Sequence, residues 1–304
     1  MLTPRRRAFS LIELTMVLAI VSALGASIGV LLMRQQRFYR GTSELITTRQ
    51  SVRDALEVLA TDMRGMSVAD TARLLADSAF EFFSTVGSSI VCQSPASSEV
   101  TLAPATSGAT LTSFAGQPDT GDLALFYVDS GPIEQRWHRY RIASFSARVL
   151  STTCPPSSGF SREADVANAA KGFAVALTDT LDPHIHAGSP VRFIRRGRYS
   201  LYRASDGEWY LGYRRCNAMG ASVCGSVQPL SGPYRAYSRD AEQSGVAFEY
   251  FDRSGGSALA SPLSLARVDV SARAASRQSL MMRGRAWTPS DSARVSVAIR
   301  NRLR

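Results

Sequence analysis

Residues 9–33 of the chain read FSLIELTMVLAIVSALGASIGVLLM, and this stretch decides the fold. From Leu14 to Met33 it holds 20 consecutive residues without a charge. A helix of about 20 apolar residues is long enough to cross a hydrocarbon layer of about 30 Å. No later stretch of the 304 residues approaches this length. The sequence therefore predicts one membrane segment and a body outside the bilayer, made of one large domain or two small ones.

A single acidic residue, Glu13, stands near the start of this segment, after the three arginines at 5–7. A charge at mid-membrane costs about 2.5–3.5 kcal/mol on insertion scales, and no basic residue occurs between Phe9 and Met33. Cleavage between Ala8 and Phe9 would create an α-amino group four residues from Glu13, in the same subunit or in a neighbour. The carboxylate would then have a cation at its own depth.

The segment 5–14, RRRAFSLIEL, followed by the apolar helix, resembles the type III signal of type IV pilins and secretion pseudopilins. In that family a prepilin peptidase cuts on the cytoplasmic side and methylates the new N-terminus. The resemblance implies cleavage after Ala8, N-methylation of Phe9 and an assembly role for Glu13, which would set axial register. The family usually has glycine before the cut, where this chain has Ala8.

Small residues form two series along the membrane segment. Gly25 and Gly29 make a G-x-x-x-G pattern, and Ala19, Ala23 and Ser27 recur at steps of four. Such faces let neighbouring helices approach closely. The pattern suits lateral assembly of many such helices, although small residues are common in any membrane helix.

Beyond the apolar segment the pattern changes to that of an amphipathic helix. No proline occurs between Pro4 and Pro95. Large apolar residues recur at intervals of 3, 4 or 7, at Leu45, Val52, Leu56, Leu59, Met63 and Met66. We expect a nearly continuous helix over residues 10–66, about 85 Å long at 1.5 Å per residue. Its second half needs an apolar cover, because an exposed stripe of this kind would aggregate.

The rest of the chain predicts short antiparallel strands. Candidates are Leu123–Asp129, residues 137–145, 173–177 and 191–194, and the alternating sets Val246, Phe248, Tyr250, then Val268, Val270, then Val295, Val297, Ile299. The alternation in residues 199–213 around Asp206 and Gly207 predicts a hairpin. The final third is expected to form a sheet with arginine-rich outer faces. Residues 93–121 and 151–172, rich in Ser, Thr, Gly and Pro, are predicted to be long loops.

The C-terminal half extends the resemblance. Residues 248–256, FEYFDRSGG, the strand around Val268 and Val270, and the closing segment 295–302, VSVAIRNR, resemble PilW-type minor pilins. The J-type minor pseudopilin of type II secretion is similar in plan but usually shorter. The resemblance implies an α+β, type IV pilin-like fold, with a long N-terminal helix packed on an antiparallel sheet. The expected parts are a leader at 1–8, a transmembrane assembly segment at 9–33, an amphipathic half at 34–66 and a periplasmic β-rich domain at 67–304.

The net charge is +10, from 35 basic and 25 acidic residues, and every basic residue but Lys171 is arginine. The arginines are spread along the whole chain, whereas a nucleic-acid surface clusters them with interleaved aromatics. The densest candidate is residues 192–203, and the alternative for it is a solvated pair of strands. Nucleic acid is therefore not an expected partner. Arg34, Arg37 and Arg40 balance the leader arginines, so charge alone does not set the membrane orientation.

Four cysteines, Cys92, Cys154, Cys216 and Cys224, fall in the part placed outside the cytoplasm, where disulfides persist. Three pairings are possible. The short span between Cys216 and Cys224 favours a bridge there, which leaves Cys92 to pair with Cys154. A zinc site is the competing interpretation, but the sequence has neither a C-x-x-C nor a nearby Cys/His set.

Other candidate ligands and catalytic groups are sparse. His184 and His186 could present two imidazoles on one strand face, but a polar loop is the better interpretation of that segment. Asp240, Glu249 and Asp252 lack the spacing of a calcium loop. The chain contains no G-x-S-x-G, H-E-x-x-H or phosphate-loop motif. We expect no enzyme activity, cofactor or metal.

The resemblance implies a minor pilin that takes part in assembly of type IV pili and supports twitching motility and adhesion. It implies a single-pass protein of the inner membrane that later joins the pilus at the cell surface. Its partners would be other minor pilins, the major pilin, the prepilin peptidase, an inner-membrane assembly platform and a tip adhesin. Two alternatives stay open: a J-type type II secretion pseudopilin, and a signal-anchored periplasmic protein.

Overall fold

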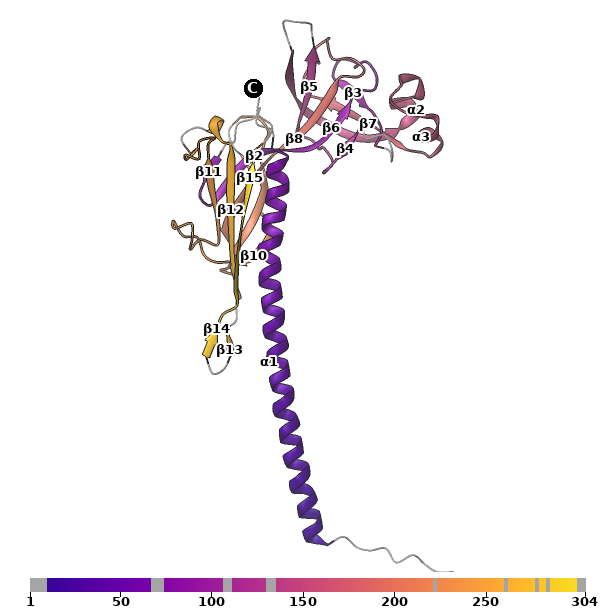
Figure 1. Ribbon diagram of the computed structural model, residues 1–304. Helices are drawn as coiled ribbons and strands as arrows, with labels where there is room; N and C mark the ends of the chain where they lie inside the picture. Colours follow the sequence, from indigo (N-terminus) through magenta and orange to yellow (C-terminus); the bar gives the residue numbers. More distant parts are fainter. Residues whose placement is uncertain are drawn as a thin grey trace, which may run out of the picture.

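The longest element of the computed structural model is helix α1, Leu11–Arg64, with 54 residues (Figure 1). The structure describes residues 10–66, 74–105, 111–129, 135–220, 223–259, 262–276, 279–282 and 285–299. Ser10 caps the helix, since its side chain accepts the N–H of Ile12, and Glu13 in the first turn suits the positive end of the helix dipole. The predicted helix over 10–66 is thus confirmed to within two residues at its far end.

The helix ends where its backbone is bonded to a strand. The carbonyl of Gly65 accepts the N–H of Thr85 at 2.8 Å, and Met66 forms an isolated bridge with Ser84. A residue cannot continue the helix and pair with a strand at once. The end of α1 is therefore fixed directly on the strand that contains residues 84 and 85.

Fifteen strands and several short helices are described. The strands are β1 (Leu74–Ala76), β2 (Ala79–Ile90), β3 (Glu99–Leu102), β4 (Ser113–Phe114), β5 (Leu123–Asp129), β6 (Gln135–Val149), β7 (Lys171–Leu177), β8 (Pro190–Arg203), β9 (Trp209–Arg215), β10 (Gln228–Tyr234), β11 (Val246–Phe251), β12 (Arg267–Ala275), β13 (Leu280–Met282), β14 (Arg285–Trp287) and β15 (Ser290–Ala298). The short helices are α2 (Leu150–Thr153), α3 (Glu163–Ala167) and the 3-10 turns η1 (Pro156–Ser158) and η2 (Pro262–Ser264).

One 13-stranded sheet runs through the body in the order β11-β12-β10-β9-β8-β5-β6-β7-β3. Off this path β15 pairs with β12, β2 pairs with β8, and β1 and β4 pair with β2. A separate ribbon, β13 with β14, stands apart from the sheet. The expected α+β layout, a long apolar N-terminal helix followed by a large antiparallel sheet, is confirmed.

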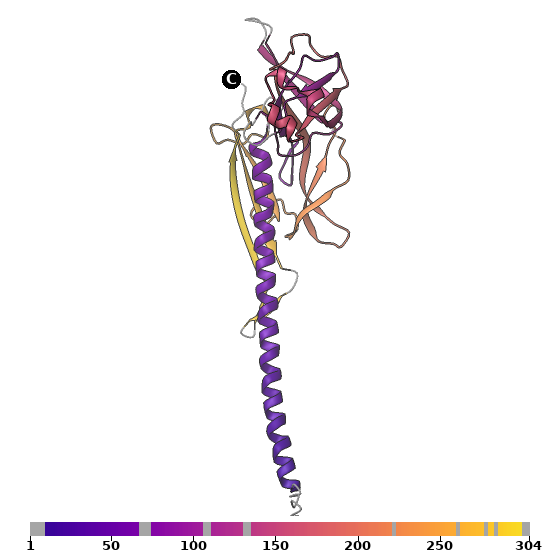
Figure 2. The same cartoon turned by 90° about the vertical axis from the view of Figure 1, so that its right-hand side faces the viewer.

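The long strands β2 and β8 join two lobes. Residues 197–203 of β8 pair with β9, whereas residues 191–194 pair with β5, and β2 follows β8 along almost its whole length. We call the lobe with α1, β9–β12 and β15 the helix lobe, and the lobe with β3–β7, α2 and α3 the distal lobe. Figures 1 and 2 show the distal lobe beyond the C-terminal end of α1. Every element of the distal lobe apart from the shared strands falls between β2 and β8 in the chain.

Each lobe has its own core. In the helix lobe, Val52, Leu59 and Met63 of α1 pack with side chains of the sheet, among them Phe80, Phe82, Leu201, Leu211, Phe248, Val268 and Val270. In the distal lobe Val100, Phe126, Ile142, Val175 and Phe193 form a second cluster. The change of core along β2 falls at a register shift between Thr85 and Gly87. A Cβ at Gly87 would meet the Phe114 ring at 2.4 Å, so this close approach needs glycine.

Most of the predicted strands are confirmed. β5 has the predicted bounds, and the hairpin of β8 and β9 pairs Tyr199 with Tyr213 around Asp206 and Gly207. The prediction that 93–121 and 151–172 are only loops is wrong for part of each. The first contains β3 and β4, because Val100 and Leu102 are buried, and the second contains α3 and most of α2, which packs its Leu150 beside the Cys92–Cys154 disulfide.

Candidate functional site

The first half of α1 is uncovered. From residue 10 to residue 40 every side chain except the half-buried Gly29 is exposed, including Leu11 at 82% and Leu18 at 69%. Figure 1 shows most of this half projecting beyond the body. The helix is long and apolar enough to cross a membrane, and none of its most apolar window is buried in the chain. An apolar surface of this size needs either lipid or other protein around it.

Three hydroxyl groups within this segment are satisfied locally. The hydroxyls of Thr15, Ser22 and Ser27 donate to the carbonyls three or four residues earlier, those of Ile12, Leu18 and Ala23. Such bonds leave no hydroxyl proton in need of water, as an apolar medium requires. A Cβ placed at Gly25 or Gly29 would meet nothing within 4 Å, so the small-residue face is open to a neighbour.

Glu13 lies in the first turn of α1 and is exposed. The first basic residue after it on the helix is Arg34, 21 residues on, or about 31 Å along the axis. Ala8 and Phe9, the predicted cleavage and methylation positions, lie outside the described residues. Within the described part of the helix, no basic residue lies closer to Glu13 along the chain than Arg34.

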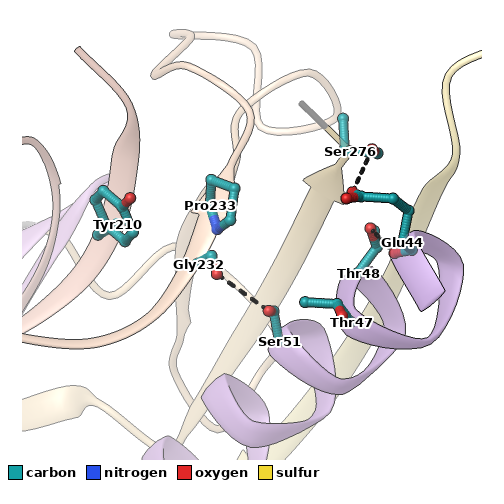
Figure 3. Close-up of a pocket in the computed structure, with 9 residues that line it drawn as sticks. Glu44, Thr47, Thr48, Ser51, Tyr210, Gly232, Pro233 and Ser276 are labelled. Carbon is teal, nitrogen blue, oxygen red and sulfur yellow. Dashed lines mark hydrogen bonds between the residues drawn. The ribbon is translucent and has the colours of Figure 1, made fainter. Parts of the chain in front are cut away.

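The second half of α1 is covered by the helix lobe. It packs against β10, β12 and β15 and buries Val52, Leu59 and Met63, as the predicted stripe requires. Between the helix and the sheet lies a cavity of about 270 Å³, lined by Glu44, Thr47, Thr48, Ser51, Tyr210, Gly232, Pro233, Ala275 and Ser276. Figure 3 shows two hydrogen bonds across it, from Ser276 to Glu44 at 2.7 Å and from Ser51 to the Gly232 carbonyl at 3.1 Å. These bonds hold the helix at a fixed level on the sheet.

Buried tyrosines hold the same half of the helix. The Tyr234 hydroxyl donates to the carbonyl of Ser51 at 2.7 Å, and Tyr199 donates to the carboxylate of Asp62. Burial raises the pKa of Tyr234 to about 12 and raises the pKa of Tyr199 further. Both phenols therefore stay protonated as donors across the physiological range. Sequence patterning placed Tyr199 in a hairpin but gave no sign that it binds the helix.

Two disulfides are present, with the pairings that the spacing favoured. Cys92 is bonded to Cys154 within the distal lobe, and Cys216 to Cys224 after β9. Among the described residues, Glu81, Cys216 and Cys224 bring possible metal-ligand atoms within 4.8 Å of one another. They do not fit a metal, because the two sulfurs are bonded to each other and Glu81 binds Arg196 and Arg198.

Three arginines of the densest arginine segment, Arg195, Arg196 and Arg198, are paired with acids. Glu81 is fully buried and accepts bonds from Arg196 at 2.6 Å and from Arg198 at 2.6 Å. Asp122, also buried, accepts bonds from Arg195 and Arg215. These four guanidinium groups thus share two buried carboxylates, and Arg196 is itself buried, so these arginines are engaged within the body. The sequence gave no sign that Glu81, in a strand of phenylalanines, is their partner.

The histidines make local contacts. His184 Nδ1 lies 2.9 Å from Asp182 Oδ1, while His186 Nδ1 lies 2.8 Å from the carbonyl of His184. The backbone N–H of His184 has the largest effect and lowers the pKa of Asp182; burial opposes it, and the His184 ring lowers the pKa further. The two imidazoles have separate partners, so this segment is a hydrogen-bonded loop around the buried Ile185.

The three acids considered for calcium are each used locally. Asp252 Oδ1 accepts the N–H groups of Ser254 and Gly256, and the Ser254 hydroxyl hydrogen bond leads the effects that lower the pKa of Asp252. Asp240 accepts the N–H of Glu242, and Glu249 pairs with Arg294 at 2.9 Å. Each carboxylate therefore already has a partner, within its own turn for Asp252 and Asp240 and across β12 on β15 for Glu249.

Comparison of the chain with protein-family models, curated proteins and solved structures finds no match. The resemblance of residues 5–14 and of the C-terminal strands to pilins therefore stays an expectation. Among the described residues, the feature with the clearest functional character is the uncovered first half of α1, because its exposed apolar surface has no counterpart elsewhere in the body.

Proposed function

We propose that this chain is a minor type IV pilin of the PilW type. It is made as a prepilin, cut between Ala8 and Phe9, methylated at Phe9 and held in the inner membrane with its body in the periplasm. It is then incorporated into a pilus or its priming complex, where it supports twitching motility and adhesion. The observation that carries the proposal is the division of one continuous helix into an uncovered apolar half and a covered amphipathic half.

The physical mechanism follows from that division. In the bilayer, lipid covers the first half of α1. On extraction the same surface needs a new apolar cover, which the corresponding helices of neighbouring subunits supply through the small-residue faces at Gly25 and Gly29. One surface thus serves both as membrane anchor and as assembly interface.

Glu13 sets the axial position of one helix against another. Its carboxylate meets the Phe9 amine of an adjacent subunit, and methylation leaves that amine charged. A buried ion pair contributes little net stability, but a mispaired charge in an apolar bundle is costly. The pair therefore selects one register among the many that a smooth apolar rod would allow.

The proposal gives the body no catalytic work. Two disulfides and buried arginine–carboxylate pairs hold the body together, and hydrogen bonds from tyrosines fix it on the helix, as a subunit carried into a fibre requires. Other minor pilins, the major pilin, the assembly platform and a tip adhesin are the proposed partners.

Intact-mass and N-terminal peptide analysis of the protein from its own membranes tests the proposal. We expect a chain that begins at N-methyl-Phe9. Retention of residues 1–8, or a cut near residue 30, would instead support a signal-anchored periplasmic protein. Deletion of the gene separates the remaining alternative: loss of pili or twitching supports the pilus role, and loss of protein secretion supports a J-type pseudopilin.

A further inference from the structure

The ribbon of β13 and β14 extends the β12–β15 pair beyond the sheet. β12 and β15 are paired from Arg267 with Ala298 to Ala275 with Ser290, and the ribbon then continues with Leu280 opposite Trp287. In Figures 1 and 2 it lies beside α1 and points toward the uncovered half of the helix. None of the sequence predictions assigned this segment a role.

The level of the ribbon along α1 is fixed by a hydrogen bond. Ser276, at the base of the ribbon, donates to Glu44 at 2.7 Å. Met282 lies six residues beyond Ser276, so an extended strand at about 3.3 Å per residue reaches at most about 20 Å farther. Along the helix, Glu44 and Met33 are eleven residues apart, or about 17 Å. An extended ribbon is thus long enough for Met282 to come level with the end of the uncharged run.

The composition of the ribbon matches that level. Its strands are Leu-Met-Met and Arg-Ala-Trp, and Arg285, Ala286 and Trp287 are exposed, Trp287 at 41%. Tryptophan favours the boundary between headgroups and acyl chains, because its ring is apolar and its N–H is polar. Arginine at the same boundary is attracted to anionic headgroups. On α1, Arg34, Arg37 and Arg40 begin at this level too.

We propose that the β13–β14 ribbon is a second membrane contact, whose occupant is the headgroup layer of the periplasmic leaflet. It rests on the proposed function, since the plane of the bilayer is taken from α1. Two contacts, the helix and the ribbon, restrict the tilt and rotation of the body above the bilayer. The subunit is thereby held in one orientation before it is extracted.

Tryptophan quenching in vesicles tests this contact. The full-length chain and its Trp287→Phe variant are reconstituted in phosphatidylethanolamine with anionic phosphatidylglycerol, with or without bromine on the acyl chains. Trp137 in the distal lobe and Trp209 on the helix-lobe core serve as internal background. We expect the Trp287 component, taken as the difference between the two proteins, to lose roughly half of its intensity in brominated lipid.

Three results would overturn the inference in distinguishable ways. If the chain floats with the vesicles but the wild type and the Trp287→Phe variant are quenched equally, α1 is inserted in the membrane and the ribbon does not contact lipid. A chain that does not float would overturn the anchor and the ribbon contact together. Two further comparisons test the anionic headgroups: replacement of phosphatidylglycerol by phosphatidylcholine, and the Arg285→Gln variant. If neither changes the quenching, the assignment of anionic headgroups is overturned.

Discussion

The two halves of α1 share one backbone and differ in what surrounds them. In the first half large apolar residues occupy every side of the helix and stay exposed, whereas in the second half they form a stripe buried under the sheet. In the second half the apolar stripe of the helix matches the sheet that covers it, because the same chain supplies both. The first half has no cover within the described chain, so its surroundings have to come from lipid or from other subunits.

The largest expected effect comes from a substitution in the first half of α1, at Glu13. Glu13→Ala removes one member of the proposed ion pair and leaves the Phe9 amine unpaired, which costs about 3–5 kcal/mol in a buried setting. We expect cleavage after Ala8 to persist and incorporation into pili to fall at least about a hundredfold, measured by immunoblotting of sheared fibres. Glu57→Ala, on the exposed side of the second half, is the matched control. Normal incorporation of Glu13→Ala would contradict the register role.

The next largest effect comes from a core substitution in the covered second half of α1. Leu59 is fully buried, so Leu59→Ala should lower the free energy of unfolding by about 2–5 kcal/mol, measured by denaturation in detergent micelles. Leu24→Ala, in the uncovered half at 59% exposure, makes the same chemical change and should leave unfolding of the body unaltered. Equal losses for the two variants would mean that the first half is also packed within the chain.

Alkaline pH should weaken the covered half alone. Burial raises the pKa of Tyr234 from 10.0 to about 12. A group with a raised folded pKa contributes stability below its unfolded pKa and loses that contribution as pH rises toward the folded value. We expect a loss of about 2–3 kcal/mol from Tyr234 between pH 10 and about 12. Tyr234→Phe should have a flatter pH dependence of unfolding over that range, and an identical slope would contradict the role of its burial.

The smallest expected effect concerns the hydrogen bond from Ser276 to Glu44, near the boundary between the two halves. Ser276→Ala removes the hydrogen bond to the half-buried Glu44 and should cost about 1 kcal/mol in unfolding experiments. Ser22→Ala deletes a hydroxyl that bonds only within the exposed helix, and should cost nothing there. Comparable losses would indicate that the bond across the cavity contributes no specific stability.

The sequence predicted those parts of the fold whose two faces differ. The second half of α1 and the β8–β9 hairpin each have one exposed and one buried face. Apolar residues therefore recur with a period of 3.6 residues in the helix, at Val52, Leu59 and Met63, and of 2 residues in the strands around Asp206 and Gly207. β2 escaped prediction because both of its faces are buried along most of its length, so its phenylalanines run together without alternation.

The candidate site was accessible to sequence reasoning for a similar reason. A long apolar run with one carboxylate is a local signal, as is the short spacing of Cys216 and Cys224. The contact of Glu81 with Arg196 joins residues 115 positions apart, and the bond from Ser276 to Glu44 joins residues 232 apart. No local pattern encodes such contacts, because they depend on how the strands are ordered in the sheet.

The distal lobe leaves β2 at Ile90 and returns at Pro190, and these two residues are partners in the β2–β8 ladder. Its entry and exit are therefore adjacent, and its own disulfide, Cys92–Cys154, crosses to nothing outside. The lobe thus has the geometry of a module placed at the tip of a hairpin, where insertions and replacements are tolerated. A short turn or an unrelated module could replace it with little change to the helix lobe. The surface farthest from the uncovered half of α1 can thus change while the helix lobe stays constant.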